Sequence, residues 1–220
     1  MQLTAALAAA LGVSWASGMN LYAAVAVLGF MHHFGGVELP GDLAVTAHPA
    51  VLILATVMYL IEFVADKVPY VDTVWDVVHT FIRVPAGAAL AAASFADYGP
   101  VAETIFVLLG GGLALSSHSS KAATRVAVNM SPEPVSNSLV SLGEDGLVFG
   151  LVALAIFHPV LAILAMMGII ALTIYLLPKI IRLLLVAFGK IKRFLTGSGP
   201  VTGEVVGETI VTVVVDSIIE

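Results

Sequence analysis

The sequence predicts an all-α, polytopic membrane protein with about six transmembrane helices. Hydrophobic residues make up 60% of the 220 positions, charged residues make up 11%, and the mean hydropathy is +1.06. Soluble domains are about 25% charged, so a chain this apolar has too little polar surface to fold in water. Each helical crossing needs roughly 20 mostly apolar residues, and about six crossings account for nearly all of residues 1–195. The absence of cysteine excludes disulfides, thiolate metal sites and a cysteine nucleophile.

The first half of the chain contains three predicted spans. Residues 3–34 carry no Asp, Glu, Lys or Arg, so they form one long span, which Gly18 and Asn20 weaken at its centre. The second span, residues 48–65, ends at a polar turn that begins with Asp66 and Lys67. The third span, residues 72–96, is charged in its first half and rich in alanine in its second half.

The second half of the chain contains three more predicted spans. Residues 101–126 pass through three consecutive glycines to a polar end, and a proline-rich turn then opens the fifth span, residues 134–157. The sixth span, residues 159–178, follows His158. Pro178 ends or kinks this span, because proline lacks the helix donor and clashes with the preceding turn.

Lysine and arginine predict the orientation, since cytoplasmic loops collect positive charge. In a six-span map the loops that carry basic residues lie on the same face as the N-terminus, whereas the opposite loops carry Glu38, Asp42, Asp97 and Glu103. The expected location is the bacterial cytoplasmic (inner) membrane, multi-pass, with both termini in the cytoplasm.

A basic segment follows the sixth span. Residues 179–195 place Lys179, Arg182, Lys190 and Arg193 on one face, a pattern typical of a helix in the headgroup layer that binds anionic lipid. The alternative is that the sixth span simply continues into the cytoplasm. Residues 196–220 form an acidic tail, predicted to be cytoplasmic, with a strand over residues 209–215.

Ionisable and polar residues recur within the predicted spans at helical spacing. Such groups are costly in a membrane and usually face a partner or a water-filled cavity. Asp72, Asp76, His79 and Arg83 follow one another at intervals of four, three and four, which places them on one helical face. The full set of candidate pathway residues is Asn20, Glu62, Asp66, Asp72, Asp76, His79, Arg83, His118, Lys121, Arg125, Glu144 and Asp145.

Two interpretations of this set stay open. Six carboxylates and four cations, Lys67 included, suit a hydrated cavity open to the cytoplasm, where two unbalanced negative charges leave room for a cation or proton. The same residues could instead form an ion-pair network that only holds the helices together. The glycines near these positions, among them Gly18 and residues 110–112, either break helices that line a cavity or permit close packing.

The run from Glu62 through Asp66-Lys67-Val68-Pro69 to Arg83 resembles an uncharacterised family of bacterial and plastid membrane proteins, domain of unknown function 4126. Residues 17–22, Ser-Gly-Met-Asn-Leu-Tyr, and residues 118–145, with Lys-x-x-x-Arg, Ser-Pro-Glu-Pro and Gly-Glu-Asp, are also similar to it. The resemblance covers roughly residues 10–190. It implies a multi-span inner-membrane protein and brings no activity.

The expected function is transport or conduction of a small solute or cation, with proton coupling through His79 as one option. The alternatives are a membrane-embedded enzyme acting on a lipid or isoprenoid headgroup, and a non-catalytic membrane scaffold. Asp76, His79 and His118 give only a weak metal signal, because no HExxH pattern occurs. We expect no cofactor and no nucleic acid. The expected partners are the lipid bilayer, anionic lipids, a small ion or solute, and a second copy in a homo-oligomer.

Overall fold

The computed structural model describes residues 2–68, 71–129 and 134–195, and these are mostly helical. The predicted strand at residues 209–215 lies outside them. The chain divides into one unit up to Ile170 and a second from Ala171 onward, and we describe each by itself.

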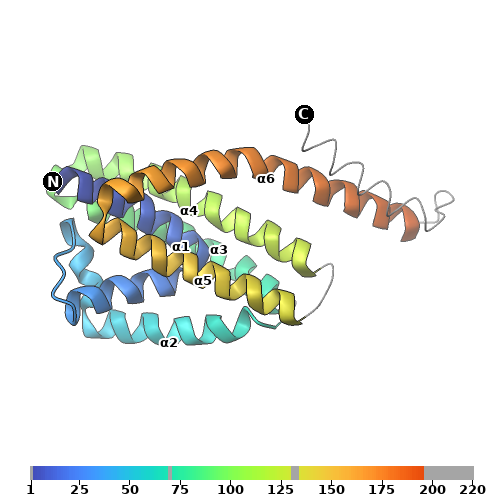
Figure 1. Ribbon diagram of the computed structural model, residues 1–220, viewed down its shortest axis with the longest axis horizontal. Helices are drawn as coiled ribbons and strands as arrows, with labels where there is room; N and C mark the ends of the chain where they lie inside the picture. Colours follow the sequence, from blue (N-terminus) through green and yellow to red (C-terminus); the bar gives the residue numbers. More distant parts are fainter. Residues whose placement is uncertain (1, 69–70, 130–133, 196–220) are drawn as a thin grey trace. The chain divides into compact units, whose positions relative to one another are not determined.

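Six α-helices and two short 3-10 helices make up the described chain (Figure 1). They are α1 (Gln2–His33), η1 (Gly41–Ala47), α2 (Pro49–Ala65), α3 (Val71–Ser94), η2 (Ala96–Tyr98), α4 (Pro100–Asn129), α5 (Pro134–Phe157) and α6 (Pro159–Leu195). Within the described ranges, five helices are long and apolar enough to span a membrane, or six if η1 and α2, bent by 70°, count as one span. The prediction of an all-α, multi-pass membrane protein is confirmed.

The first predicted span is not one continuous helix. Asn20 has non-helical backbone angles, φ −150° and ψ 96°, and divides α1 into residues 2–19 and residues 21–33. A straight helix of this length would extend about 48 Å, yet Gln2 at its start and Glu38 just beyond its end line the same pocket. The two parts therefore form a hairpin with its vertex at Asn20. In Figure 1 the dark blue part runs away from the N-terminus and the lighter blue part returns.

The side chain of Asn20 explains where the second part begins. Its Oδ1 accepts a hydrogen bond from the backbone N–H of Ala23 at 3.0 Å, which is the geometry of a helix N-cap. Asparagine is among the best N-cap residues because its short side chain can satisfy an N–H group in the first helical turn.

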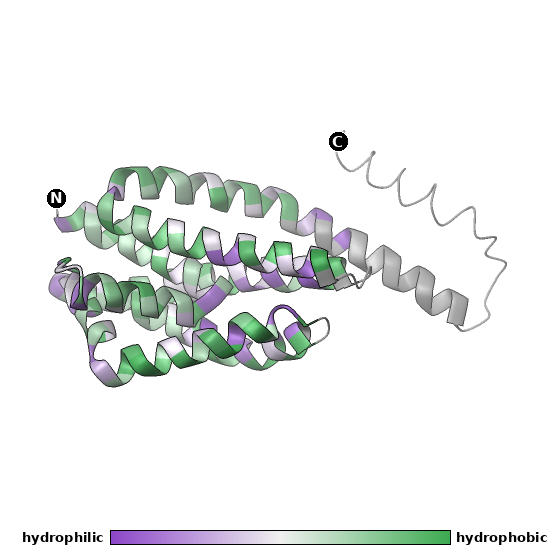
Figure 2. Ribbon diagram, turned by 60° about the horizontal axis from the view of Figure 1, so that its bottom comes forward, coloured by the Kyte–Doolittle hydropathy of each residue, from purple (hydrophilic) through white to green (hydrophobic). Residues whose placement is uncertain are grey.

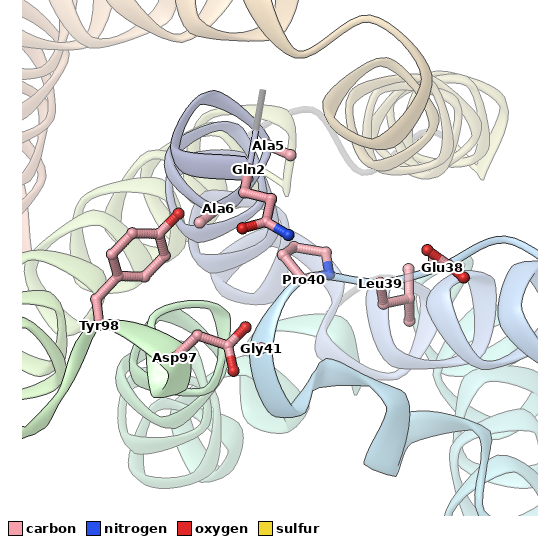
Figure 3. Close-up of a pocket in the computed structure, with 9 residues that line it drawn as sticks. All are labelled: Gln2, Ala5, Ala6, Glu38, Leu39, Pro40, Gly41, Asp97 and Tyr98. Carbon is pink, nitrogen blue, oxygen red and sulfur yellow. The ribbon is translucent and has the colours of Figure 1, made fainter.

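The hairpin corrects the predicted position of the N-terminus. Gln2 lies beside Pro40, Gly41 and Asp97 in a pocket between α1, the loop after it and η2 (Figure 3). Lys67 follows the far end of α2, which begins beside η1 and extends about 25 Å along its axis. The N-terminus and Lys67 thus lie at opposite ends of the bundle. The six-span map, which puts them at the same end, does not describe this arrangement, because α1 reverses its direction at Asn20. The orientation of the bundle in the membrane stays a prediction.

Small residues let α1 approach its neighbours closely. A Cβ atom added at Gly18 would lie 1.9 Å from the Ser117 Oγ and 2.1 Å from the Ala114 carbonyl oxygen. At Gly87 and Gly110 an added Cβ would also lie too close, with its nearest atom at 2.5 and 2.4 Å, whereas at Gly112 or Gly146 it would meet nothing within 4 Å. Close packing is therefore the role of Gly18, Gly87 and Gly110. Gly112 and Gly146 instead lie on the outer faces of α4 and α5.

The outer faces of the helices are apolar, as expected of surfaces that contact lipid. Figure 2 shows largely hydrophobic helices interrupted by hydrophilic positions. Exposed side chains such as Phe81, Leu108 and Leu139 are each more than 60% accessible. A soluble protein rarely exposes so many large apolar groups, so these surfaces agree with a membrane environment.

In the second unit, α6 continues as a helix past Pro178 to Leu195, so Pro178 does not end the helix. The segment apolar enough to span a membrane is Pro159–Leu176, and both alternatives for the residues after it stay predictions. The Lys179 ammonium donates to the Tyr175 hydroxyl at 2.9 Å, and Arg182 is exposed. The side chains of Lys190 and Arg193 lie outside the described part. Binding of lipid headgroups by this segment stays a prediction.

The hairpin predicts a labelling pattern in sealed membranes. Because the chain has no cysteine, the single variants Gln2→Cys and Asp42→Cys should react with an impermeant thiol reagent from the same side. Val68→Cys, at the far end of α2, should react from the other side. Labelling of Gln2→Cys from the Val68 side would contradict the hairpin and restore a complete first crossing.

The packing of Gly18 predicts a matched pair of alanine substitutions. Gly18→Ala should destabilise the protein by roughly 1 to 3 kcal/mol, because α1 and α4 must separate to admit a methyl group. Gly112→Ala should not destabilise the protein. We expect it to raise the free energy of unfolding by up to about 1 kcal/mol, because alanine has a better helix propensity than glycine. Thermal unfolding in detergent compares the two, and equal midpoints would contradict the close approach.

Candidate functional site

The ionisable residues predicted from the sequence come together in one buried group between α2, α3, α4 and α5. We call it the charged cluster and define it by these side chains: Glu62, Asp66, Asp72, Asp76, Arg83, Lys121, Arg125, Glu144 and Asp145. None is more than 8% exposed. The spacing of three and four residues within each helix turns them all toward the same interior space.

Arg83 joins α3 to α2 within the charged cluster. Its guanidinium donates to Glu62 Oε1 at 2.7 Å and to Asp76 Oδ1 at 2.8 Å. Glu62 lies on another helix, whereas Asp76 lies two turns earlier on the same one. Arg83 and Glu62 are both fully buried, so their attraction is little screened by water.

Lys121 lies at the centre of the charged cluster. Its ammonium is 2.8 Å from Asp66 Oδ2 and 3.4 Å from Glu62 Oε1, and Asp76 and Glu144 lie at 3.6 and 4.0 Å. It also donates to the backbone carbonyl of Met19 at 3.2 Å. One cation from α4 thus contacts groups on α1, α2, α3 and α5.

Arg125 connects α4 to the start of α5. Its guanidinium donates to Glu144 Oε2 at 2.5 Å and lies 3.4 Å from Asp66 Oδ2. Asn137 accepts a further hydrogen bond from it at 2.8 Å, and Asp72 lies 3.8 Å away. Arginine suits this position because its several N–H donors can serve several acceptors at once.

The break in α1 lies against the charged cluster, and each end of the break faces a group of opposite charge. Lys121 contacts the carbonyl of Met19, at the negative C-terminal end of residues 2–19. Asp145 accepts a hydrogen bond from the Asn20 amide at 3.0 Å, at the positive N-terminal end of residues 21–33. The polarity of each helix end suits the group that it contacts, and the break is held from α4 and from α5.

His118 and His79 lie beside the charged cluster in different settings. His118 Nδ1 is 3.3 Å from the Arg83 guanidinium, which can only donate, so this nitrogen accepts and the ring is neutral. Its Nε2 is 2.6 Å from the Thr80 hydroxyl. His79 instead stacks on Trp75 and bonds to that residue's carbonyl at 2.8 Å, so the structure places it at the edge of the network.

The charged cluster has more negative than positive groups. Among the described residues, the cations that form ion pairs with the six carboxyls are Arg83, Lys121 and Arg125, so carboxyls exceed ion-paired cations by three. Lys67 forms no ion pair with any described residue and lies partly exposed at the edge, although its charge acts on Asp66 and Asp145. The negative excess is therefore two when Lys67 is counted, as in the prediction, and three when it is left out.

Several carboxylate oxygens in the charged cluster are also unsatisfied. Within the described ranges, one oxygen of each of Glu62, Asp66, Asp76 and Asp145 is buried without a hydrogen-bond partner. A buried, unpaired polar atom costs about 1 to 3 kcal/mol, and more when it carries charge. The Nε atoms of Arg83 and Arg125 are unpartnered as well, so the described part of the charged cluster contains both donors and acceptors that can take a further partner.

The described residues contain no group of three His, Asp or Glu side chains placed to hold one metal ion. The carboxylates are oriented toward Arg83, Lys121 and Arg125 instead of converging on a shared centre. The weak metal signal from Asp76, His79 and His118 thus finds no support in the geometry.

The sequence identified every member of the charged cluster but missed three neighbours. Asn137 contacts Arg125, Thr80 contacts His118, and Tyr22 packs edge-on against His79. Tyr22 lies two residues after the break in α1, a position that the pattern of a straight span gave no reason to select. Asn137 could have been found, since it lies two turns before Glu144 and on the same face of α5.

A separate pocket of about 340 Å³ lies at the end of the bundle where α1 begins. Its polar lining includes Gln2, Glu38, Asp97 and Tyr98 (Figure 3). The 2–19 part of α1 extends from this end to the charged cluster. Closely packed alanines such as Ala8, Ala9 and Ala10, each at most 1% exposed, fill that interval.

The chain belongs to the family described as Domain of unknown function (DUF4126), whose model matches residues 7–179. That range includes the hairpin and the whole charged cluster, which confirms the resemblance seen in the sequence. No curated protein and no solved structure matches the chain.

The position of Lys121 predicts a large stability effect. Lys121→Met should destabilise the protein by about 3 to 5 kcal/mol, because it leaves buried carboxylates without their shared cation. Lys67→Met is the matched control, and it should cost less than about 1 kcal/mol because Lys67 is partly exposed and unpaired with a carboxylate. Denaturant unfolding in micelles measures both. Similar losses in the two variants would show that the charged cluster does not depend on Lys121.

Proposed function

We propose that this protein moves a small cation, or a small solute together with protons, across the membrane by way of the charged cluster. The observation that carries the proposal is the imbalance of the site: among the described residues, six buried carboxyls form ion pairs with three cations, and four carboxylate oxygens accept no hydrogen bond. If the charged cluster only held helices together, equal numbers of carboxylates and cations would be more stable than this excess of carboxyls.

The free-energy cost of burying charges in a membrane is the reason to prefer transport over a purely structural role. Charges inside a membrane are expensive, and replacing a buried ion pair by apolar side chains is often neutral or stabilising. Stability alone therefore gives little reason to bury surplus carboxyls. Binding of a cation or proton gives such a reason, because the ligand supplies the missing positive charge.

The break in α1 supports the same proposal. In transporters, half-helices that meet near the bilayer midplane commonly present their ends to ions or substrates. Here the ends of residues 2–19 and residues 21–33 face Lys121 and Asp145. Since the 2–19 part and its neighbours fill the space on the other side, passage requires this hairpin to move.

For the orientation, the positive-inside rule favours a cytoplasmic location for the end that holds Lys67. The other end carries Glu38, Asp42 and Asp97 and no described Lys or Arg. We therefore propose a bacterial inner-membrane protein whose N-terminus faces away from the cytoplasm. The charged cluster then lies nearer the cytoplasmic face.

A structural role is the second candidate, and a specific observation favours it. Arg83, Lys121 and Arg125 each contact carboxylates on at least one other helix, so the charged cluster links α2, α3, α4 and α5. Under this alternative the protein is a rigid membrane scaffold, and neutralising one carboxyl changes stability alone.

Flux measurements separate the two candidates. Purified protein in proteoliposomes should dissipate an imposed Na⁺, K⁺ or proton gradient, and Glu144→Gln should lower the rate by about tenfold or more, since it changes a buried charge that contacts Arg125. The matched control is Glu103→Gln, in the first turn of α4 and outside the charged cluster. Melting temperatures are recorded for each variant.

A wild type that carries no flux under any of these gradients would overturn the transport proposal for those ions. If, in addition, Glu144→Gln lowers only the melting temperature, the scaffold is the correct function. Equal loss of flux in Glu144→Gln and Glu103→Gln would show that the charged cluster is not the pathway.

A further inference from the structure

Asp145 differs from the other carboxyls of the charged cluster. Glu62, Asp66, Asp72, Asp76 and Glu144 each have a Lys or Arg nitrogen within 4.0 Å. Asp145 forms no ion pair with any residue that the structure describes. Its Oδ1 accepts from the neutral amide of Asn20, and its Oδ2 is buried without a partner, although the side chain is only 4% exposed.

The groups around Asp145 do not neutralise it. Tyr59 faces it from α2, Asp66 and Lys67 from the end of α2, Asn20 from α1 and Lys121 from α4, while Glu144 adjoins it on α5. Lys121 is already shared among the other carboxylates. Asp145 is therefore a buried carboxyl that no described cation pairs with and whose second oxygen has no hydrogen-bond partner. An ionised carboxylate in such a position is costly, and a bound proton removes that cost.

Lys67 is the basic group at the water-facing edge. Its ammonium donates to the Phe63 carbonyl at 2.9 Å, and it lies 3.5 Å from the hydroxyl of Ser141, one helical turn before Asp145. Burial lowers the pKa of Lys67, so this ammonium gives up a proton more readily than a lysine in water. It is therefore suited to pass protons between the solvent and Asp145.

We infer that the proton is the ligand of the charged cluster and that the Asp145 carboxyl holds it at the vertex of the α1 hairpin. This inference rests on the proposed function and names the coupling ion. In the loading step, a proton from water reaches the Asp145 carboxylate past Lys67 and forms an O–H bond. Release is the reverse step, and no electrons are transferred.

Proton binding at this position also acts on the hairpin. The amide of Asn20 donates to Asp145, and a hydrogen bond to a charged carboxylate is roughly twice as strong as one to a neutral acid. Protonation therefore weakens the link between α5 and the start of residues 21–33. The proton and the movement required of the hairpin are in this way coupled through one hydrogen bond.

The test is infrared spectroscopy of the full-length protein in lipid, which detects the carbonyl stretch of protonated carboxylic acids directly. At neutral pH the wild type should show a protonated-acid band that Asp145→Asn abolishes or reduces. Asp42→Asn, an exposed residue of η1, is the matched control and should keep the full band. Because Asn mimics the neutral acid, Asp145→Asn should fold. Asp145→Glu, which should shift the band, provides a second variant.

The outcomes separate this inference from the proposed function. No protonated-acid band in the wild type, or a band unchanged in both Asp145 variants, overturns the inference even if flux is present. A band lost in Asp145→Asn and shifted in Asp145→Glu, in a protein that carries no flux, supports the proton site and rejects transport. Flux that persists undiminished in Asp145→Asn also overturns the inference.

Discussion

The structure depends on the burial of Lys121 among carboxylates from three other helices. A lysine with this little exposure must have partners, and it finds Asp66 at 2.8 Å and Glu62 at 3.4 Å. Its contact with the Met19 carbonyl adds the broken helix to the same group. Because a stranded cation inside a membrane is costly, the positions of α1, α2 and α4 are fixed relative to one another by this side chain.

The sequence predicted the helices and the charged cluster well, for a physical reason. Ionisable side chains cannot face lipid, so the face that carries Asp72, Asp76 and Arg83 had to turn inward. The helical period then determines which residues share that face. The same reasoning could not show how the charges pair, because pairing depends on helix packing, and so Lys67 was counted with the carboxylates although it forms no ion pair with any described residue.

The hairpin in α1 was missed because its sequence lacks charges. An uncharged apolar segment of this length predicts one span. A straight helix of the length of α1 would nevertheless extend about 48 Å, which exceeds the roughly 30 Å thickness of the hydrocarbon core. That excess and the pair Gly18 and Asn20 were the available signals. Gly18 permits the close approach to α4, and Asn20 begins a new helix. The difference in the relative placement of the N-terminus and Lys67 followed directly, since one missed reversal moves the N-terminus to the other end of the bundle.

The hairpin also has a consequence for biosynthesis. The two contacts that hold its vertex join residues separated by 102 and 125 positions, Met19 with Lys121 and Asn20 with Asp145. At a synthesis rate of 5–20 residues per second, roughly 5 to 25 s pass between emergence of the vertex from the ribosome and emergence of these partners. During that interval the broken backbone at Asn20 lacks its partners from α4 and α5. The two contacts that hold the vertex can therefore form only after α4 and most of α5 have been made.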